Sequence, residues 1–162
     1  MKTLKITLFA FLMAATSLVS AQGKMAEKDS EVQKNKEVVI KFNEEYWGSG
    51  NVEITKELLA DNYVNHFAPP NGPNGRSLMV QLMTGFKKGF SNVTVDFQEV
   101  IGEGDIVSMV KTITATHTGD FMGKAATEKK IVINIVETDV LKNGKITEAW
   151  AQSNFSQVIQ SL

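Results

Sequence analysis

The sequence contains no cysteine among its 162 residues and only two histidines, His66 and His117. The absence of cysteine excludes disulfide bonds, thiol nucleophiles and thiolate metal sites. A catalytic zinc site usually takes three protein ligands, so two histidines without an evident third ligand predict no metal site. The formal charge of -1 shows no excess of basic residues, whereas a nucleic-acid-binding protein usually carries a basic patch. We therefore expect no nucleic-acid partner.

Long apolar runs are lacking except near the N-terminus, where residues 6–19 are apolar apart from Thr and Ser. Lys2 and Lys5 precede this run, and small residues up to Ala21 offer a cleavage point. This arrangement is typical of a secretory signal peptide and is too short for a convincing membrane span. We predict a periplasmic or secreted protein with no membrane partner after cleavage. Its parts are a signal peptide over 1–21, a flexible lead over 22–29 and one domain over 30–162.

Apolar residues at helical spacing predict three helices in the first half of the chain. Ser30 and Gln33 have the spacing of a capping box, which places the start of the first helix at Ser30. Glycines at 48 and 50 end that helix, and Asn51 can cap a short second helix. The apolar stripes of the three helices are Val32, Val39, Phe42 and Tyr46; Ile54, Leu58 and Leu59; and Leu78, Met79, Leu82, Met83, Phe86 and Phe90.

The second half of the chain changes to alternation with a period of two, which predicts four strands. His117 ends the clearest of them and shares a face with Val107, Met109, Ile113 and Ala115. Asn143 and Gly144 lie between two alternating runs, which is a strong hairpin signal. The strands are expected around 93–97, within 104–123, and over 130–141 and 146–155.

Helices followed by strands with short connections predict an α+β domain, with helices packed on one face of an antiparallel sheet. The strand at 130–141 is apolar on both faces: Ile131, Ile133 and Ile135 on one, and Val132, Val136 and Val140 on the other. One face can meet the helices, and the other needs a second cover. A partner subunit would supply that cover, so we expect a homodimer.

Four stretches of the sequence form a familiar set: YVNH at 63–66, GEGDIV at 102–107, THTGDFMG at 116–123 and GKITEAW at 144–150. They resemble the SnoaL-like polyketide cyclase, or ester cyclase, family of the nuclear transport factor 2 superfamily. The resemblance implies three N-terminal helices on a curved, mainly antiparallel four-stranded sheet, in a cone-shaped, cystatin-like roll. It also implies a central, mostly apolar pocket for a small organic molecule, with neither a metal nor an organic cofactor.

In characterised cyclases of this family, an Asp on the last strand is the acid/base of an intramolecular aldol closure. It follows a Trp by four residues, and here that spacing runs from Trp150 to Asn154. An amide donates and accepts hydrogen bonds, but it does not exchange a proton usefully near neutral pH. Glu137 and Asp139 are the remaining acids on the neighbouring strand, and the sequence does not select either of them as the replacement.

Both histidines have a functional and a structural interpretation. His66 is the leading acid/base candidate, because a histidine side chain titrates near neutral pH; alternatively, it bonds the backbone of the following loop. His117 is either a catalytic residue at the mouth of the pocket or a residue that orders the turn at Gly119 and Asp120. The turn chemistry of its neighbours favours the second interpretation.

Alternation on the last strand places five side chains on one face: Ile146, Glu148, Trp150, Gln152 and Asn154. Trp150 and Asn154 on that face would suit an apolar ligand with a carbonyl or hydroxyl group. The alternative is that Trp150 belongs to the core and that Glu148 pairs with a lysine. The candidate site residues are His66, Asn154 and His117 for catalysis, and Tyr63, Trp150, Glu148 and Asp139 for ligand binding.

Two functions stay open at this point. One is a cofactor-free cyclase, isomerase or dehydratase that acts on a carbonyl substrate. The other is a binding module that uses the same pocket without chemistry. The amide at position 154 favours the binding module, whereas the two histidines favour the enzyme.

Overall fold

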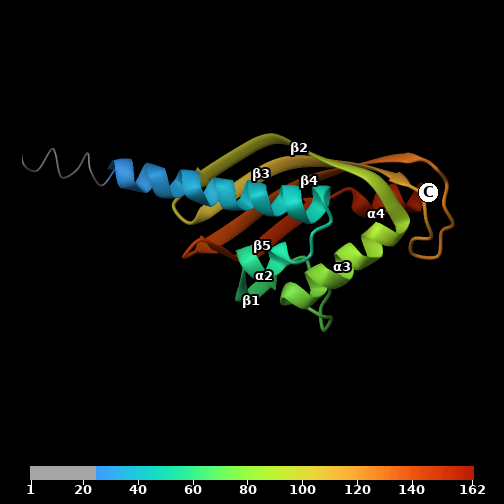
Figure 1. The fold of residues 1–162 in the computed structure, drawn as a ribbon, viewed down its shortest axis with the longest axis horizontal. Coiled ribbons are helices and arrows are strands. Elements are labelled where there is room, and N and C mark those ends of the chain that lie inside the picture. The colour runs from blue at the N-terminus through green and yellow to red at the C-terminus, as the bar shows by residue number, and fades with distance from the viewer. Residues whose placement is uncertain (1–24) are drawn as a thin grey trace, which may run out of the picture.

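The computed structural model describes residues 25–162, and Figure 1 shows helices covering one face of a curved sheet. The long N-terminal helix (25–43) continues into the π-helical η1 (Glu44–Gly48), followed by α2 (Ile54–Leu58), α3 (Gly75–Gly89) and α4 (Phe155–Gln160). The strands are β1 (Leu59–Asn65), β2 (Phe90–Glu103), β3 (Ile106–His117), β4 (Lys130–Lys142) and β5 (Lys145–Ser153). The predicted α+β class is confirmed. The predicted signal peptide lies outside the described residues.

The sheet has five strands in the order β1-β5-β4-β3-β2, one more than the sequence predicts. Strands β2 to β5 form an antiparallel meander, and β1 joins its edge parallel to β5. The sequence predicts only an extended segment at β1, because Asp61 and Asn62 are poor strand formers and interrupt the apolar pattern. Pairing with β5 is what makes this segment a strand, with Val64 opposite Glu148 and Asn65 opposite Ala149.

The first helix begins earlier than the predicted start at Ser30. Residues 25–29 are already helical, so the capping-box pattern at Ser30 lies inside the helix. The sequence MAEKD of this turn consists mostly of strong helix formers, which explains the extension. Further along, the buried Asn35 donates a hydrogen bond of 3.1 Å from Nδ2 to the carbonyl of Gly104. This bond attaches the helix to the turn between β2 and β3.

The last predicted strand is too long. β5 ends at Ser153, and α4 follows after Asn154, where the sequence predicts strand as far as residue 155. The Asn154 side chain bonds to β4 where the strand ladder ends: its Oδ1 accepts from the Asn134 backbone N–H at 2.9 Å, and its Nδ2 donates to the Val132 carbonyl at 3.4 Å. Helical spacing was the missed signal, in Phe155, Val158, Ile159 and Leu162.

The alternation predicted for β3 is confirmed by the buried side chains Val107, Met109, Ile113, Ala115 and His117. Lys111 lies on this same inward face and is fully buried, which makes it the exception among apolar neighbours. The predicted hairpin is also confirmed, because Asn143 and Gly144 connect β4 to β5 with φ angles of 52° and 71°. Positive φ at both central residues matches the tight turn that the Asn-Gly pair favours.

The core consists of two apolar clusters on the helix-covered face of the sheet. One gathers Val39, Phe42, Tyr46, Leu59, Met109 and Ile146, among others. The second gathers Phe86, Phe90, Ile113, Ile133, Ile135 and Ile159, among others. Side chains from both clusters line the cavity described below. No helix within residues 25–162 is long and apolar enough to cross a membrane.

Candidate active site

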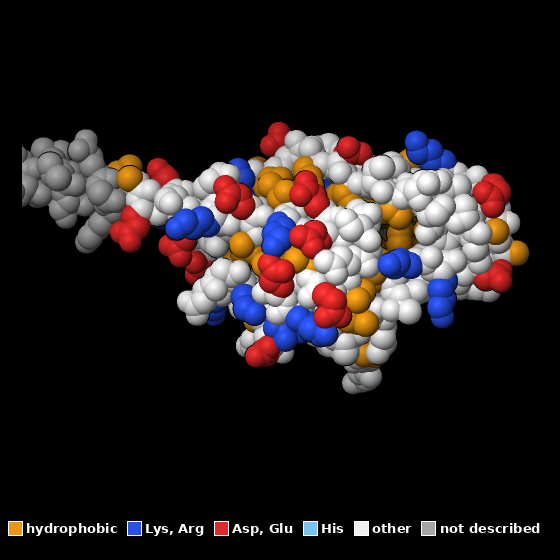
Figure 2. Space-filling view, viewed as in Figure 1, with side chains coloured by type: hydrophobic (Ala, Val, Ile, Leu, Met, Phe, Trp, Pro, Cys, Tyr) orange, Lys and Arg blue, Asp and Glu red, His pale blue; other side chains and the backbone are white. Residues whose placement is uncertain are grey.

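A cavity of about 360 Å³ lies between the inner face of the sheet and the helices that cover it. Its walls are mostly apolar and include Phe42, Leu78, Phe86, Ile113, Ile133 and Phe155. Figure 2 shows apolar side chains inside a hollow of the surface near the C-terminal end of α3. A volume and lining of this kind are typical of sites for small organic molecules.

Two acidic side chains, Glu137 and Asp139 of β4, interrupt this apolar lining. They continue the inward face begun by Ile131, Ile133 and Ile135, because side chains two residues apart share a face of a strand. Asp139 is 1% exposed, and the Glu137 side chain is 15% exposed. The sequence identified both acids as open alternatives, and their inward position follows from the same alternation that placed the isoleucines.

Lys111 on the paired strand β3 neutralises one of these acids. Its Nζ lies 2.8 Å from Oε2 of Glu137 and also donates to the side-chain oxygen of Asn43. Asn43 ends the long helix and is itself held by a hydrogen bond of 3.0 Å to the Val39 carbonyl. Sequence reasoning missed Lys111, although a lysine at an inward position between Met109 and Ile113 was a visible break in the pattern.

Asp139 has no such partner. Its Oδ2 is buried without a hydrogen-bond partner among the described residues. Burial raises the pKa of this carboxyl well above its usual range, and the negative charge of Glu137 and a hydrogen bond to it act in the same direction; the charge of Lys111 opposes the shift. Asp139 therefore holds its proton at pH values where an exposed aspartate is ionised.

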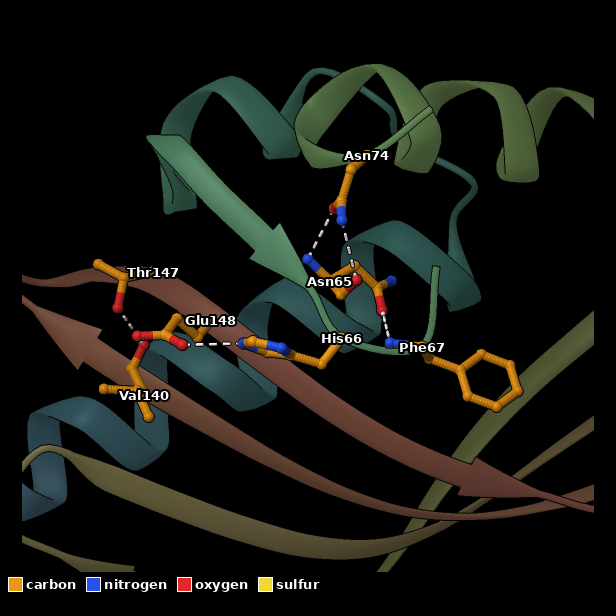
Figure 3. Close-up of polar contacts among 7 residues, drawn as sticks. All are labelled: Asn65, His66, Phe67, Asn74, Val140, Thr147 and Glu148. Atoms are coloured by element: carbon orange, nitrogen blue, oxygen red, sulfur yellow. Dashed lines mark hydrogen bonds and ion pairs between the residues drawn. The ribbon is translucent and has the colours of Figure 1, made fainter. Parts of the chain in front are cut away.

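Tyr63 of β1 adds a neutral hydroxyl to the same cavity. Burial raises the pKa of Tyr63, and the negative charge of Glu137 raises it further. Its neighbour along the strand, Asn65, also lines the cavity and is fixed by Asn74: the Asn65 backbone N–H donates to Asn74 Oδ1 at 2.8 Å, as Figure 3 shows. The cavity thus combines two carboxyl groups with donors from β1.

His66, Glu148 and Trp150 form a second polar cluster, which we call the outer cluster. His66 Nε2 lies 2.8 Å from Glu148 Oε2 (Figure 3), and the imidazole stacks on the Trp150 ring with centroids 4.0 Å apart. All three side chains are at least one-third exposed, and none of them lines the cavity. The structure therefore brings three predicted site residues together, but away from the cavity where a ligand was expected.

A β-bulge explains why the last strand does not follow the predicted faces. Between the pairs Leu141–Ile146 and Val140–Glu148 the register shifts, so Thr147 is an extra residue in β5. Its hydroxyl donates to the Val140 carbonyl at 3.0 Å (Figure 3). An extra residue reverses the alternation beyond it. Ile146 consequently lies inside the cavity wall, whereas Glu148 and the residues two and four positions further along point outward.

Comparison with known proteins identifies the fold and the family. Residues 37–162 match the SnoaL-like polyketide cyclase family. The chain belongs to this family. No curated protein matches the chain.

Solved structures of SnoaL-like proteins have the same fold. A candidate polyketide cyclase from Acidithiobacillus ferrooxidans is 26% identical with a TM-score of 0.69, and the match covers 80% of this chain and 94% of that one. AclR, a candidate hydroxylase from Streptomyces galilaeus, is 22% identical with a TM-score of 0.70, covering 80% and 96%. IdmH, a candidate polyketide cyclase from Streptomyces antibioticus, is 22% identical with a TM-score of 0.65, covering 77% and 96%.

This SnoaL-like chain departs from the resemblance at the position of the last-strand acid. Asn154 is half-buried and is held by the backbone of β4, and it does not line the cavity, although its neighbours Ser153 and Phe155 do. The amide therefore terminates β5 and fixes the start of α4.

His117 also lies outside the cavity lining. It is fully buried, its Nδ1 lies 3.0 Å from Thr127 Oγ1, and its ring packs against Phe90. Its backbone N–H and carbonyl bond to Lys129 and Glu128. These contacts tie the loop between β3 and β4 to the end of β3, which agrees with the structural interpretation. Among residues 25–162, no group of three or more His, Asp or Glu side chains is arranged to hold a metal ion.

Proposed function

We propose that this SnoaL-like protein binds a small, mostly apolar carbonyl compound in the cavity and acts on it as a cofactor-free cyclase, isomerase or dehydratase. The observation that carries the proposal is the pair of carboxyl groups, Glu137 and Asp139, in a cavity whose walls are otherwise mostly apolar. Buried carboxyl groups are unfavourable for folding unless they are paired. Their presence at a cavity wall is typical of a functional site.

The cavity suits a ligand with an apolar body and one polar end. Ile113, Ile133 and Phe86 offer aromatic and aliphatic surface for the body. Tyr63 and Asp139, both neutral, can donate hydrogen bonds to a carbonyl oxygen. These features support binding of a carbonyl compound by shape and by hydrogen bonding together.

The second candidate function is binding without chemistry. Asn154 favours it, because an amide stands where the family resemblance implies the acid/base Asp, and that amide bonds only to backbone groups of β4. The same cavity would then bind and release a ligand without changing it chemically.

We further propose that the protein is exported, with cleavage after Ala21, and that it forms a homodimer through the outer face of the sheet. Lys2, Lys5 and the apolar run over 6–19 support export. Three valines support the dimer: Val110, Val132 and Val136 are 40%, 45% and 55% exposed on the face opposite the helices. Val110 and Val136 are direct cross-strand partners and form a short apolar stripe, and Trp150 pairs with Thr138, two residues from Val136.

A pair of variants on neighbouring residues of β5 tests ligand binding. Ala151 lines the cavity, whereas Gln152 is exposed on the opposite face. Ala151→Phe should fill the cavity and abolish binding of an apolar fluorescent ketone such as 2-acetyl-6-(dimethylamino)naphthalene, while Gln152→Phe should bind it like wild type. Equal binding by wild type and Ala151→Phe would refute the cavity as the site. Turnover of a bound ligand, followed by mass spectrometry, separates the enzyme from the binding module.

A further inference from the structure

We propose that Asp139 and Glu137 are the catalytic acid and the catalytic base of a keto–enol proton transfer, and that the substrate is an enolisable ketone with an apolar body. This inference rests on the proposed function, because it requires a carbonyl compound in the cavity. Beyond the proposed function, it names the two residues that touch the reacting atoms and assigns a protonation state to each.

The contacts of Lys111 distinguish the two carboxyl groups. Lys111 Nζ lies 2.8 Å from Glu137 Oε2, so the ionised form of Glu137 is paired with a buried cation. Asp139 is more deeply buried, and its Oδ2 has no partner in the described part of the chain. Two neighbouring carboxyl groups in a dry site do not both ionise readily, so one of them keeps a proton. The geometry places that proton on Asp139.

The groups that interact with Asp139 come from β4, β3 and β1, and a tyrosine of η1 lies near Glu137; together they support this assignment. Glu137 on β4 contributes a negative charge, and Lys111 on β3 contributes a positive charge that Glu137 shares. Tyr63 on β1 and Tyr46 on η1 are both neutral, because burial raises the pKa of each hydroxyl. Tyr46 is also occupied, since it donates to the Met79 carbonyl at 2.7 Å. Among these groups, Glu137 is therefore the one able to accept a proton.

The proposed step conserves protons and electrons. Glu137 accepts the proton on the carbon next to the carbonyl, and the electron pair of that C–H bond forms the carbon–carbon double bond. The π pair of the carbonyl moves to its oxygen, which takes the proton of Asp139. The product is an enol, with the proton now on Glu137 and the negative charge on Asp139. Transfer of that proton between the two adjacent carboxyl groups restores the starting state.

The mouth of the cavity indicates the rest of the substrate. Phe67, Leu82 and Met122 line the cavity and are 55%, 46% and 74% exposed, so they lie where it meets solvent. Exposed apolar residues around an opening favour a ligand whose outer end is also apolar. The structure thus points to a ketone with its oxygen at Asp139 and an apolar group towards the mouth.

The test uses 2-acetylnaphthalene, a ketone with an apolar body and exchangeable methyl protons. Proton NMR in D2O at neutral pH follows replacement of those protons by deuterium, which reports enolisation directly. The full mature chain should accelerate the exchange above buffer. Asp139→Asn and Glu137→Gln should each lower the accelerated rate by about 100-fold or more, as expected for loss of a general acid or base. Glu99→Gln, an exposed position on β2, should exchange like wild type.

Binding of the same probe, measured by its fluorescence, separates the possible failures. The dissociation constant should change by less than about tenfold in Asp139→Asn, the effect of about one hydrogen bond. If wild type does not bind the probe, the proposed function itself fails. If wild type binds without faster exchange, or if Asp139→Asn exchanges like wild type, only the acid–base assignment is overturned.

A ligand-free measurement tests the protonation state of Asp139 without relying on catalytic activity. The infrared difference spectrum of wild type minus Asp139→Asn at neutral pH should contain the C=O band of a protonated carboxylic acid. A carboxylate band in its place would overturn the assignment. Circular dichroism of both proteins confirms that the spectra compare folded states, and Glu137→Gln supplies an independent second variant.

Discussion

The cavity wall at Lys111, Glu137 and Asp139 and the outer cluster at His66, Glu148 and Trp150 each contain a basic and an acidic side chain 2.8 Å apart, but their surroundings differ. In the outer cluster the His66 and Glu148 side chains are both about one-third exposed, so water screens their interaction. At the cavity Lys111 is fully buried, and beside the pair stands a third titratable group, Asp139, whose Oδ2 has no hydrogen-bond partner among the described residues. Burial, rather than pair distance, therefore separates a site with altered acidity from an ordinary surface contact.

The largest expected effect is on folding, in Lys111→Met. Removing this lysine leaves the carboxyl of Glu137 buried without its cation, and breaking a buried pair typically costs about 3–5 kcal/mol. Urea unfolding should show a loss of this size. Lys56→Met is the control, because the Lys56–Glu53 pair of 2.6 Å is exposed on both sides and should contribute little. If Lys111→Met lost no more unfolding free energy than Lys56→Met, burial would not distinguish the cavity pair from an exposed pair.

The second prediction concerns the pH dependence that Asp139 imposes on stability. The pKa of Asp139 is raised on folding, so the folded state binds a proton that the unfolded state has released. The free energy of unfolding should therefore fall as pH rises from about 4, the ordinary value for Asp, through the raised folded pKa. Asp139→Asn should remove this decline and become more stable than wild type towards high pH. Parallel pH profiles for the two proteins would contradict the buried proton.

The third prediction tests the outer face as a dimer interface. Val136→Glu places a charge in the apolar stripe formed with Val110, and burying that charge against a partner is unfavourable. Light scattering at micromolar concentration should show a dimer for wild type and a monomer for Val136→Glu. Met25→Glu introduces the same charge at an exposed position in the first turn of the N-terminal helix and should leave the dimer intact. A wild-type monomer would refute the proposed assembly.

The smallest expected effect is in His66→Ala. This change removes one exposed hydrogen bond to Glu148 and one ring stack, which together contribute about 1 kcal/mol. Thermal unfolding should register that loss, while binding of 2-acetylnaphthalene should match wild type. Weakened binding at unchanged stability would instead connect the outer cluster to the ligand and support a catalytic histidine.

Much of the fold could be predicted because the apolar periodicity of the sequence matches the buried faces of the folded helices and strands. The alternation around Val107 and Ile113 and the Asn143-Gly144 hairpin reflect local rules that tertiary contacts reinforce. β1 is different, since it becomes a strand only through its pairing with β5. The bulge at Thr147 depends on the register between β4 and β5, which no property of the last strand alone determines.

The site was predictable only in part for the same reason. The sequence identified Asp139 as a candidate acid but did not favour it over Glu137. What distinguishes the two carboxyl groups is Lys111, which pairs with Glu137 from a strand about 26 residues away in the sequence. That neighbourhood is a result of strand pairing between β3 and β4. His66 and Trp150 attracted attention by residue type. The bulge in β5 then placed Trp150 on the face opposite the cavity, where His66 stacks on it.

The central claim is that Asp139 carries a proton at neutral pH inside the cavity. The most direct measurement is a carbon-13 NMR titration of side-chain carboxyl groups in aspartate-labelled protein, with the Asp139 signal identified by its loss in Asp139→Asn. The Asp139 carboxyl carbon should keep the chemical shift of a protonated acid through neutral pH, above the range where exposed aspartates ionise. A shift typical of a carboxylate at neutral pH would contradict the account.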